Sequence, residues 1–85
     1  MARPSERNRQ VIRQWEILRL LEEQPSSAMQ LVGAVGDASV TIRTIFRDLE
    51  GLQAAGFPLY AEQDDDGVAR WRTLTKGLIP ARRAA

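Results

Sequence analysis

The stretch that decides the fold is VTIRTIFRDLEGLQAAGFPLY, residues 40–60. Its first part repeats apolar residues at helical spacing, and glycine with proline at Gly56 and Pro58 then stops the helix. One side of the helical wheel is aliphatic and consists of Ile42, Ile45, Leu49 and Leu52. The sequence therefore predicts an amphipathic helix that reaches Ala55 and turns this side toward a core.

The opposite side of this helix carries two arginines one turn apart, Arg43 and Arg47, with Thr44 beside them. A helix in the major groove of DNA uses such residues, because arginine reads guanine O6 and N7 or pairs with phosphate and threonine adds a hydroxyl contact. Solvated charges explain the same spacing equally well, with Glu50 pairing to Arg47. Geometry alone leaves both interpretations open.

Two more residues of this helix have an expected role. Phe46 lies on the flank, where it fits a thymine methyl group or packs against Trp71 or Tyr60. Asp48 lies beside the aliphatic side. We expect Asp48 to be structural, either in an ion pair with an arginine of the first helix or in hydrogen bonds to a nearby loop.

Two helices precede this one. RQVIRQWEILRLLEE, residues 9–23, has helical periodicity and ends before Gln24-Pro25. Its expected core face consists of Val11, Trp15, Ile17, Leu18 and Leu21. Ile12 and Leu20 fall elsewhere on the wheel, at the edge of the core or in contact with a second chain.

The second predicted helix spans residues 28–35 and begins after Ser27 and Gln30, which form a capping box. Its residues available for the core are Met29, Leu31, Val32 and Val35. The turn GDAS, residues 36–39, follows, and Ser39 or Thr41 caps the third helix. Two helices joined by a short turn form a helix-turn-helix, with the later helix in the recognition position.

The sequence that follows the third predicted helix is typical of a β-hairpin. LYAEQ (59–63) and VARWRTL (68–74) have the residue types of strands and flank DDDG, so we expect them to lean on the helices. DDDG lacks the alternating acidic positions of a calcium loop and is interpreted as a solvated turn. We expect a flexible basic arm at residues 1–8, the folded domain at 9–74, and a loose tail or the start of a linker at 75–85.

Composition narrows the function. The 85 residues suffice for one small domain, and cysteine and histidine are both absent. The usual nucleophiles, general bases and zinc ligands are therefore missing, so we expect no enzyme activity, no cofactor and no metal. No apolar run approaches the roughly 18 residues of a membrane span, which favours a cytoplasmic protein without membrane contact.

The third helix also resembles a known family. The matching residues are Val40, Thr41, Arg43, Thr44, Ile45, Arg47, Asp48, Leu49, Gly56 and Pro58. They resemble the recognition segment of the DeoR-type winged helix-turn-helix at the N-terminus of WYL-domain transcriptional regulators, and the resemblance extends over residues 9–74. It implies a mainly helical α+β fold, with three helices and a two-stranded β wing. It also implies that Trp15 lies in the core and that five side chains face DNA: Thr41, Arg43, Thr44, Phe46 and Arg47.

Three departures from the family pattern stand out. Thr41 replaces the usual serine, which is a mild change because both hydroxyls cap helices. The turn at residues 36–39 is longer than in the family. The ligand-sensing WYL domain is absent, so the chain is interpreted either as an excised DNA-binding domain or as a small protein that binds DNA without a sensor.

The wing and the arm offer further DNA contacts. Phosphates repel the acidic residues 64–66, so Arg70 and Arg72 must make any wing contact while the acidic tip stays clear. Arg3 and Arg7 of the arm are candidates for the minor groove or for phosphates, unless the arm is merely solvated.

Together these features predict sequence-specific binding of double-stranded DNA by a bacterial transcriptional regulator. A domain of this size makes few contacts, so we expect a homodimer on two half-sites. Apolar candidates for the dimer contact are Ile12, Leu20 and the segment around Leu78. The alternative is a winged-helix protein-interaction module that pairs with or antagonises a larger regulator, which the acidic wing and the net charge of +1 favour.

Overall fold

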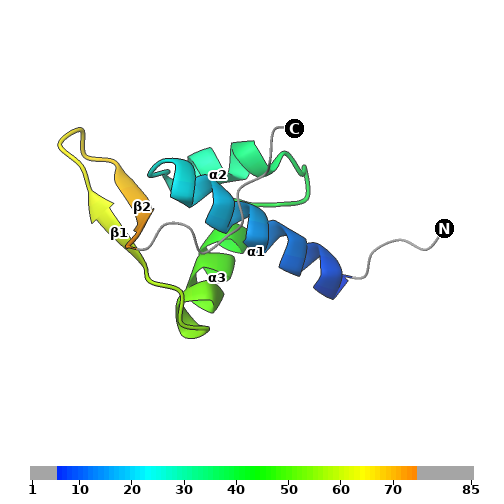
Figure 1. Ribbon diagram of the computed structural model, residues 1–85. Helices are drawn as coiled ribbons and strands as arrows, with labels where there is room; N and C mark the ends of the chain where they lie inside the picture. The colour runs from blue at the N-terminus through cyan, green and yellow to red at the C-terminus, as the bar shows by residue number, and fades with distance from the viewer. Residues whose placement is uncertain (1–5, 75–85) are drawn as a thin grey trace, which may run out of the picture.

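The computed structural model describes residues 6–74, and this range contains three helices followed by a two-stranded hairpin (Figure 1). The elements in chain order are α1 (Glu6–Glu23), α2 (Ala28–Val35), α3 (Ile42–Ala54), β1 (Leu59–Gln63) and β2 (Ala69–Thr73). The helices pack together, and the hairpin extends from one side of them as a wing (Figure 1). This arrangement confirms the predicted class, a mainly helical α+β fold with a winged-helix layout.

The core lies where the second half of α1 meets α2, α3 and the base of the wing. Its buried apolar residues are Ile17, Leu18, Leu21, Ala28, Leu31, Val40, Ile45, Leu49, Leu52 and Leu59. Partly buried residues pack against this set, among them Leu20, Val32, Val35, Phe57 and Trp71. The predicted aliphatic side of α3 is therefore confirmed at Ile45, Leu49 and Leu52.

Four residues predicted for the core are exposed instead, and that part of the prediction is wrong: Val11, Trp15, Met29 and Ile42. The N-terminal end of α1 projects past the other described elements (Figure 1), and Val11 in this part of the helix is 46% exposed. Met29 and Ile42 lie in the first turns of their helices, at the edge of the packed region. A helical wheel gives the side that faces the core but not how far along the helix the core extends.

α1 also begins earlier than predicted. It starts at Glu6, three residues before the expected start at Arg9, so Arg7 lies on a helix and not in a flexible arm. Arg3 lies outside the described residues, as do the predicted tail and Leu78. Among residues 6–74, no helix combines the length and the apolar character that a membrane span requires.

Side chains at the helix starts match the predicted caps. The hydroxyl of Ser27 accepts a hydrogen bond from the N–H of Gln30 at 3.1 Å, and Oε1 of Gln30 accepts one from the N–H of Ser27 at 2.8 Å. These two bonds form the predicted capping box. Thr41 caps α3, because its hydroxyl accepts from the N–H of Thr44 at 3.3 Å.

The turn between α2 and α3 is closed around Asp37. The N–H and the hydroxyl of Ser39 donate to Oδ1 of Asp37 at 2.9 and 2.7 Å, and these hydrogen bonds hold the pKa of that carboxyl below its ordinary value. The N–H of Val40 donates to the carbonyl of Asp37 at 2.9 Å. Gly36 ends α2 with φ 72°, a left-handed conformation that suits glycine. Ser39 therefore stabilises the turn and leaves the cap to Thr41.

The wing is an antiparallel pair that runs from Leu59 opposite Thr73 to Gln63 opposite Ala69. Ser26, between α1 and α2, is joined to it by two backbone hydrogen bonds with Trp71, of 3.1 and 2.8 Å. The side-chain amide of Gln53 donates to the carbonyl of Leu59 at 2.9 Å. The wing is thus attached to α3 and to the segment that follows α1.

Candidate nucleic-acid interface

A buried ion pair fixes the rotation of α3 against α1. Asp48 is 1% exposed, and its carboxylate accepts hydrogen bonds from both Nε and Nη2 of Arg13, the second at 3.1 Å. The side-chain amide of Gln14 lies 3.4 Å from Oδ1 of the same carboxylate. The predicted ion pair with an arginine of the first helix is confirmed, and Arg13 is that arginine. Because Asp48 and the aliphatic side of α3 both face inward, the side that carries Arg43 and Arg47 points outward.

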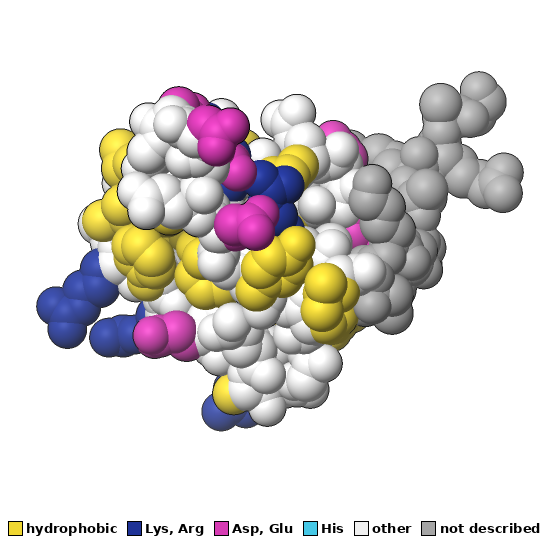
Figure 2. Space-filling view, turned by 90° about the vertical axis from the view of Figure 1, so that its left-hand side faces the viewer, with side chains coloured by type: hydrophobic (Ala, Val, Ile, Leu, Met, Phe, Trp, Pro, Cys, Tyr) yellow, Lys and Arg dark blue, Asp and Glu magenta, His cyan; other side chains and the backbone are white. Residues whose placement is uncertain are grey.

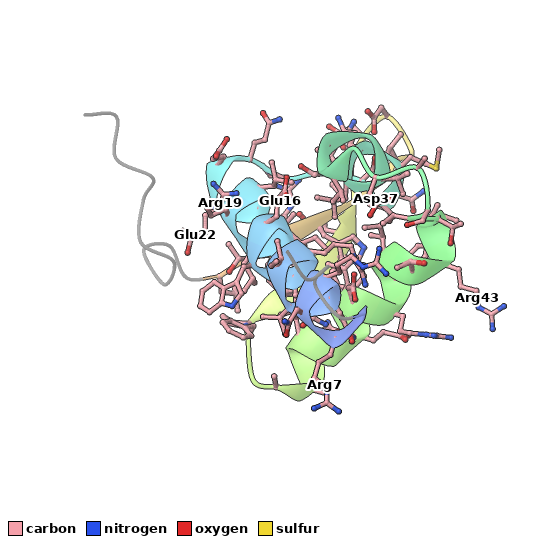
Figure 3. All side chains as sticks on the ribbon, turned by 90° about the vertical axis from the view of Figure 1, so that its right-hand side faces the viewer. Arg7, Glu16, Arg19, Glu22, Asp37 and Arg43 are labelled. Atoms are coloured by element: carbon pink, nitrogen blue, oxygen red, sulfur yellow. The ribbon has the colours of Figure 1, made fainter. Side chains whose placement is uncertain are left out.

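Arg43 and Arg47 lie on that outward side, and both are exposed. Within residues 6–74, no hydrogen bond or ion pair involves either guanidinium, so the predicted pairing of Arg47 with Glu50 is not formed. Figure 3 shows Arg43 extending away from the molecule. Both arginines are therefore available to an anionic partner.

Thr41 and Thr44 lie at the N-terminal end of the same helix. The two hydroxyl oxygens are 3.2 Å apart, and that of Thr41 also accepts the capping hydrogen bond. A helix N-terminus carries a partial positive charge and suits phosphate. Thr44 directly follows Arg43 in the first turn of α3, and the hydroxyl of Thr41 already serves the cap.

Phe46 is 43% exposed on the flank of α3. Of the two expected packing partners, Trp71 packs against the core and Tyr60 is itself exposed. A half-exposed phenyl ring next to the arginines keeps apolar surface in water, which is unfavourable unless a partner covers it. Phe46 therefore belongs to the same outward surface as Arg43 and Arg47.

The arginines of the wing are engaged differently. Arg70 donates to Asp64 at 2.7 Å and to Asp66 at 2.8 Å, and Arg72 donates to Asp64 at 2.5 Å. Hydrogen bonds from Arg70 lower the pKa of Asp66 to about 2, and the same guanidinium is the main cause of the lowered pKa of Asp64. Glu62 lies 3.3 Å from Nε of Arg72.

Arg70 and Arg72, which were expected to make any wing contact with DNA, are thus bound to the acidic tip that was expected to stay clear of it. The strand register places Arg70 opposite Glu62, and alternate residues share a face of the hairpin, so the guanidinium groups meet the carboxylates. Residues 59–73 contain four carboxylates and two guanidinium groups. Figure 2 shows acidic side chains around the basic ones near the top of this view, with separate basic side chains at the lower left. The wing presents a net negative surface, which phosphate repels.

The chain was compared with protein-family models, curated proteins and solved structures, and nothing matched. The resemblance to the DeoR-type domain therefore stays a prediction from the sequence of residues 9–74. The site is defined by its own geometry. It consists of Arg43, Phe46 and Arg47, which are exposed on α3, with Thr41 at the N-cap and the half-buried Thr44 in the first turn.

Proposed function

We propose that the chain binds double-stranded DNA in a sequence-specific manner, with α3 in the major groove, and that it regulates transcription in bacteria. The observation that carries the proposal is the pair of exposed arginines, Arg43 and Arg47, one turn apart and without partners among the described residues. The buried contact of Asp48 with Arg13 supports it, because it holds the opposite side of α3 outward.

The proposed contacts follow from side-chain chemistry. A planar guanidinium donates two parallel hydrogen bonds to O6 and N7 of guanine, or pairs with a phosphate on the groove edge. Thr44 adds a hydroxyl contact to the backbone, and Phe46 covers a thymine methyl group. The wing, with its excess of carboxylates, stays away from the duplex. In this respect the proposal differs from the initial expectation for Arg70 and Arg72.

Regulation in this proposal works by occupancy. A bound domain blocks or recruits RNA polymerase in the cytoplasm of a bacterium, and the residues involved call for no cofactor. One domain of this size buries little surface on DNA, so useful affinity requires two copies on two half-sites.

A second candidate is a protein-interaction module that pairs with or antagonises a larger regulator. The observation that favours it is the wing, whose carboxylates bind its own arginines and leave a net negative face. That surface suits a basic protein segment better than a duplex. Formation of a specific protein complex without binding to any duplex would replace the first proposal with this one.

The test is a fluorescence-anisotropy titration on a duplex that the chain enriches from a random pool. Arg43→Ala and Arg47→Ala are each expected to weaken binding by about 1–3 kcal/mol. Arg43→Lys keeps the charge but loses the fork geometry, so it should lower discrimination between bases more than affinity for DNA in general.

The matched control is Arg19→Ala, which removes the same charge from α1 on the other side of the molecule from Arg43 (Figure 3). It should leave affinity within about 0.5 kcal/mol, as surface substitutions away from a contact usually do. Equal losses of DNA affinity for Arg19→Ala and Arg43→Ala would mean that only net charge determines binding, and would refute the reading of bases by α3.

A further inference from the structure

One side of α1 carries a stripe whose two ends have opposite charge. Its members are Arg7, Val11, Trp15, Leu18 and Glu22, which recur at the three- and four-residue spacing of one helix face. The stripe is basic at the N-terminal end, apolar in the middle and acidic at the C-terminal end. Figure 3 shows the two charged members on the outer surface, toward opposite ends of the helix.

Two of the three apolar members of this α1 stripe are uncovered, whereas Leu18 is buried. Val11 is 46% exposed and Trp15 is 47% exposed. Trp15 and Leu18 also line an apolar groove of about 150 Å³, together with Leu52 and Phe57. Large apolar side chains that adjoin an open apolar groove leave surface in water whose burial is favourable.

We propose that the α1 stripe binds the α1 stripe of a second copy of the chain, with the two helices antiparallel. Antiparallel pairing places Arg7 opposite Glu22 of the second copy, and Val11 then lies opposite the second copy's Leu18, at the groove. The two Trp15 side chains meet beside the twofold axis. Each contact occurs twice, as a symmetric homodimer requires.

The distribution of charge along α1 favours a second copy of the chain as the partner and an antiparallel orientation of the two helices. Besides Arg13, which is bound to Asp48, the N-terminal half of α1 contains Arg7 and Arg9 with one acidic residue, Glu6, whereas its last two residues are Glu22 and Glu23. Antiparallel helices bring the basic end of each copy to the acidic end of the other, which is favourable. A parallel pair would bring like charges together and is disfavoured.

The dimer contact does not rest on the proposed DNA binding. Figure 3 shows Arg43 on the opposite side of the molecule from Glu22, so pairing through α1 leaves the outward side of α3 uncovered. The test uses no DNA. A failure of DNA binding leaves the dimer proposal intact, whereas a chain that stays monomeric would also remove the second copy that the proposed function requires.

The test is sedimentation equilibrium of the full 85-residue chain over a range of concentrations. Val11→Ser is expected to raise the dimer Kd about tenfold or more, because it removes a central apolar contact. The matched control is Ile12→Ser. Ile12 is 59% exposed but lies about 100° around the helix from Val11, so its replacement should change the Kd less than about twofold.

Charge reversal tests the orientation. Arg7→Glu should weaken the dimer, and the double variant Arg7→Glu with Glu22→Arg should restore it, since both pairs are rebuilt with reversed signs. Circular dichroism checks that each variant keeps its helices. The proposal is overturned by a wild-type chain that stays monomeric throughout, by equal effects of the two serine substitutions, or by a double reversal no tighter than the single one.

Discussion

Replacing Arg13 with methionine should destabilise the fold severely, because it leaves the carboxylate of Asp48 buried beside α1. Asp48 is 1% exposed and the Arg13 side chain 13%, so water replaces the lost guanidinium poorly. Among the described residues, only the amide of Gln14, at 3.4 Å from Oδ1, remains to donate a hydrogen bond. Breaking one partner of a buried pair costs about 3–5 kcal/mol. For a chain of this length the whole stability is on the order of 4–13 kcal/mol, so the variant should lose a large share of it.

The assay is a double-mutant cycle in urea, followed by circular dichroism. Arg13→Met and Asp48→Leu each remove one partner, and the double variant replaces the pair by apolar side chains. Replacing both partners of a buried pair is often neutral or stabilising, so the double variant should be more stable than either single variant. A loss below about 1 kcal/mol for Arg13→Met would refute the reasoning, since that is the worth of an exposed surface pair. The reasoning would also be refuted if the free energy of unfolding of the double variant were no higher than that of the less stable single variant.

Two further predictions concern glycine and the wing. Gly33→Ala should stabilise the chain by about 0.5–1 kcal/mol, because Gly33 lies inside α2 with open space where a Cβ would be added. Gly36→Ala should instead destabilise the chain by about 1–2 kcal/mol, because φ is 72° at that residue. Thermal unfolding measures the Tm of both variants, and equal shifts in Tm from the wild-type chain would contradict the argument. Arg70→Ala should return the pKa of Asp66 from about 2 toward 3.8, as NMR titration of that carboxyl would show. Since the pKa of Asp66 is lower in the folded chain, its pairing stabilises the wing above about pH 4, and this contribution is lost as the pH falls toward 2.

The local signals of the sequence predicted the elements well. Ser27 with Gln30 and the hydroxyl of Thr41 marked the helix starts, because caps act over three residues of chain. Asp48 was identified as structural because a carboxylate beside an aliphatic stripe needs a cation or donors when it is buried. The outward position of Arg43 and Arg47 followed from the same wheel.

The predictions that were wrong concern residues whose environment depends on neighbours distant in the sequence. Val11 and Trp15 fit the face of α1 that points to the core, but both are exposed. How much of α1 the other elements cover is set by tertiary packing, which a helical wheel does not show. The capture of Arg70 and Arg72 by the acidic turn required the register of the two strands, which places carboxylates and guanidinium groups on one face. The alternation within each strand is visible in the sequence, whereas the register that joins the two strands depends on how the turn between them folds.

The central claim is that α3 reads DNA through Arg43 and Arg47. Selection of bound duplexes from a random pool tests it most directly, with the wild-type chain and the double variant Arg43→Ala, Arg47→Ala run in parallel. The account predicts that the wild-type chain enriches one shared sequence motif and that the double variant does not. Absence of any enriched motif with the wild-type chain, or the same motif with the double variant, would contradict it.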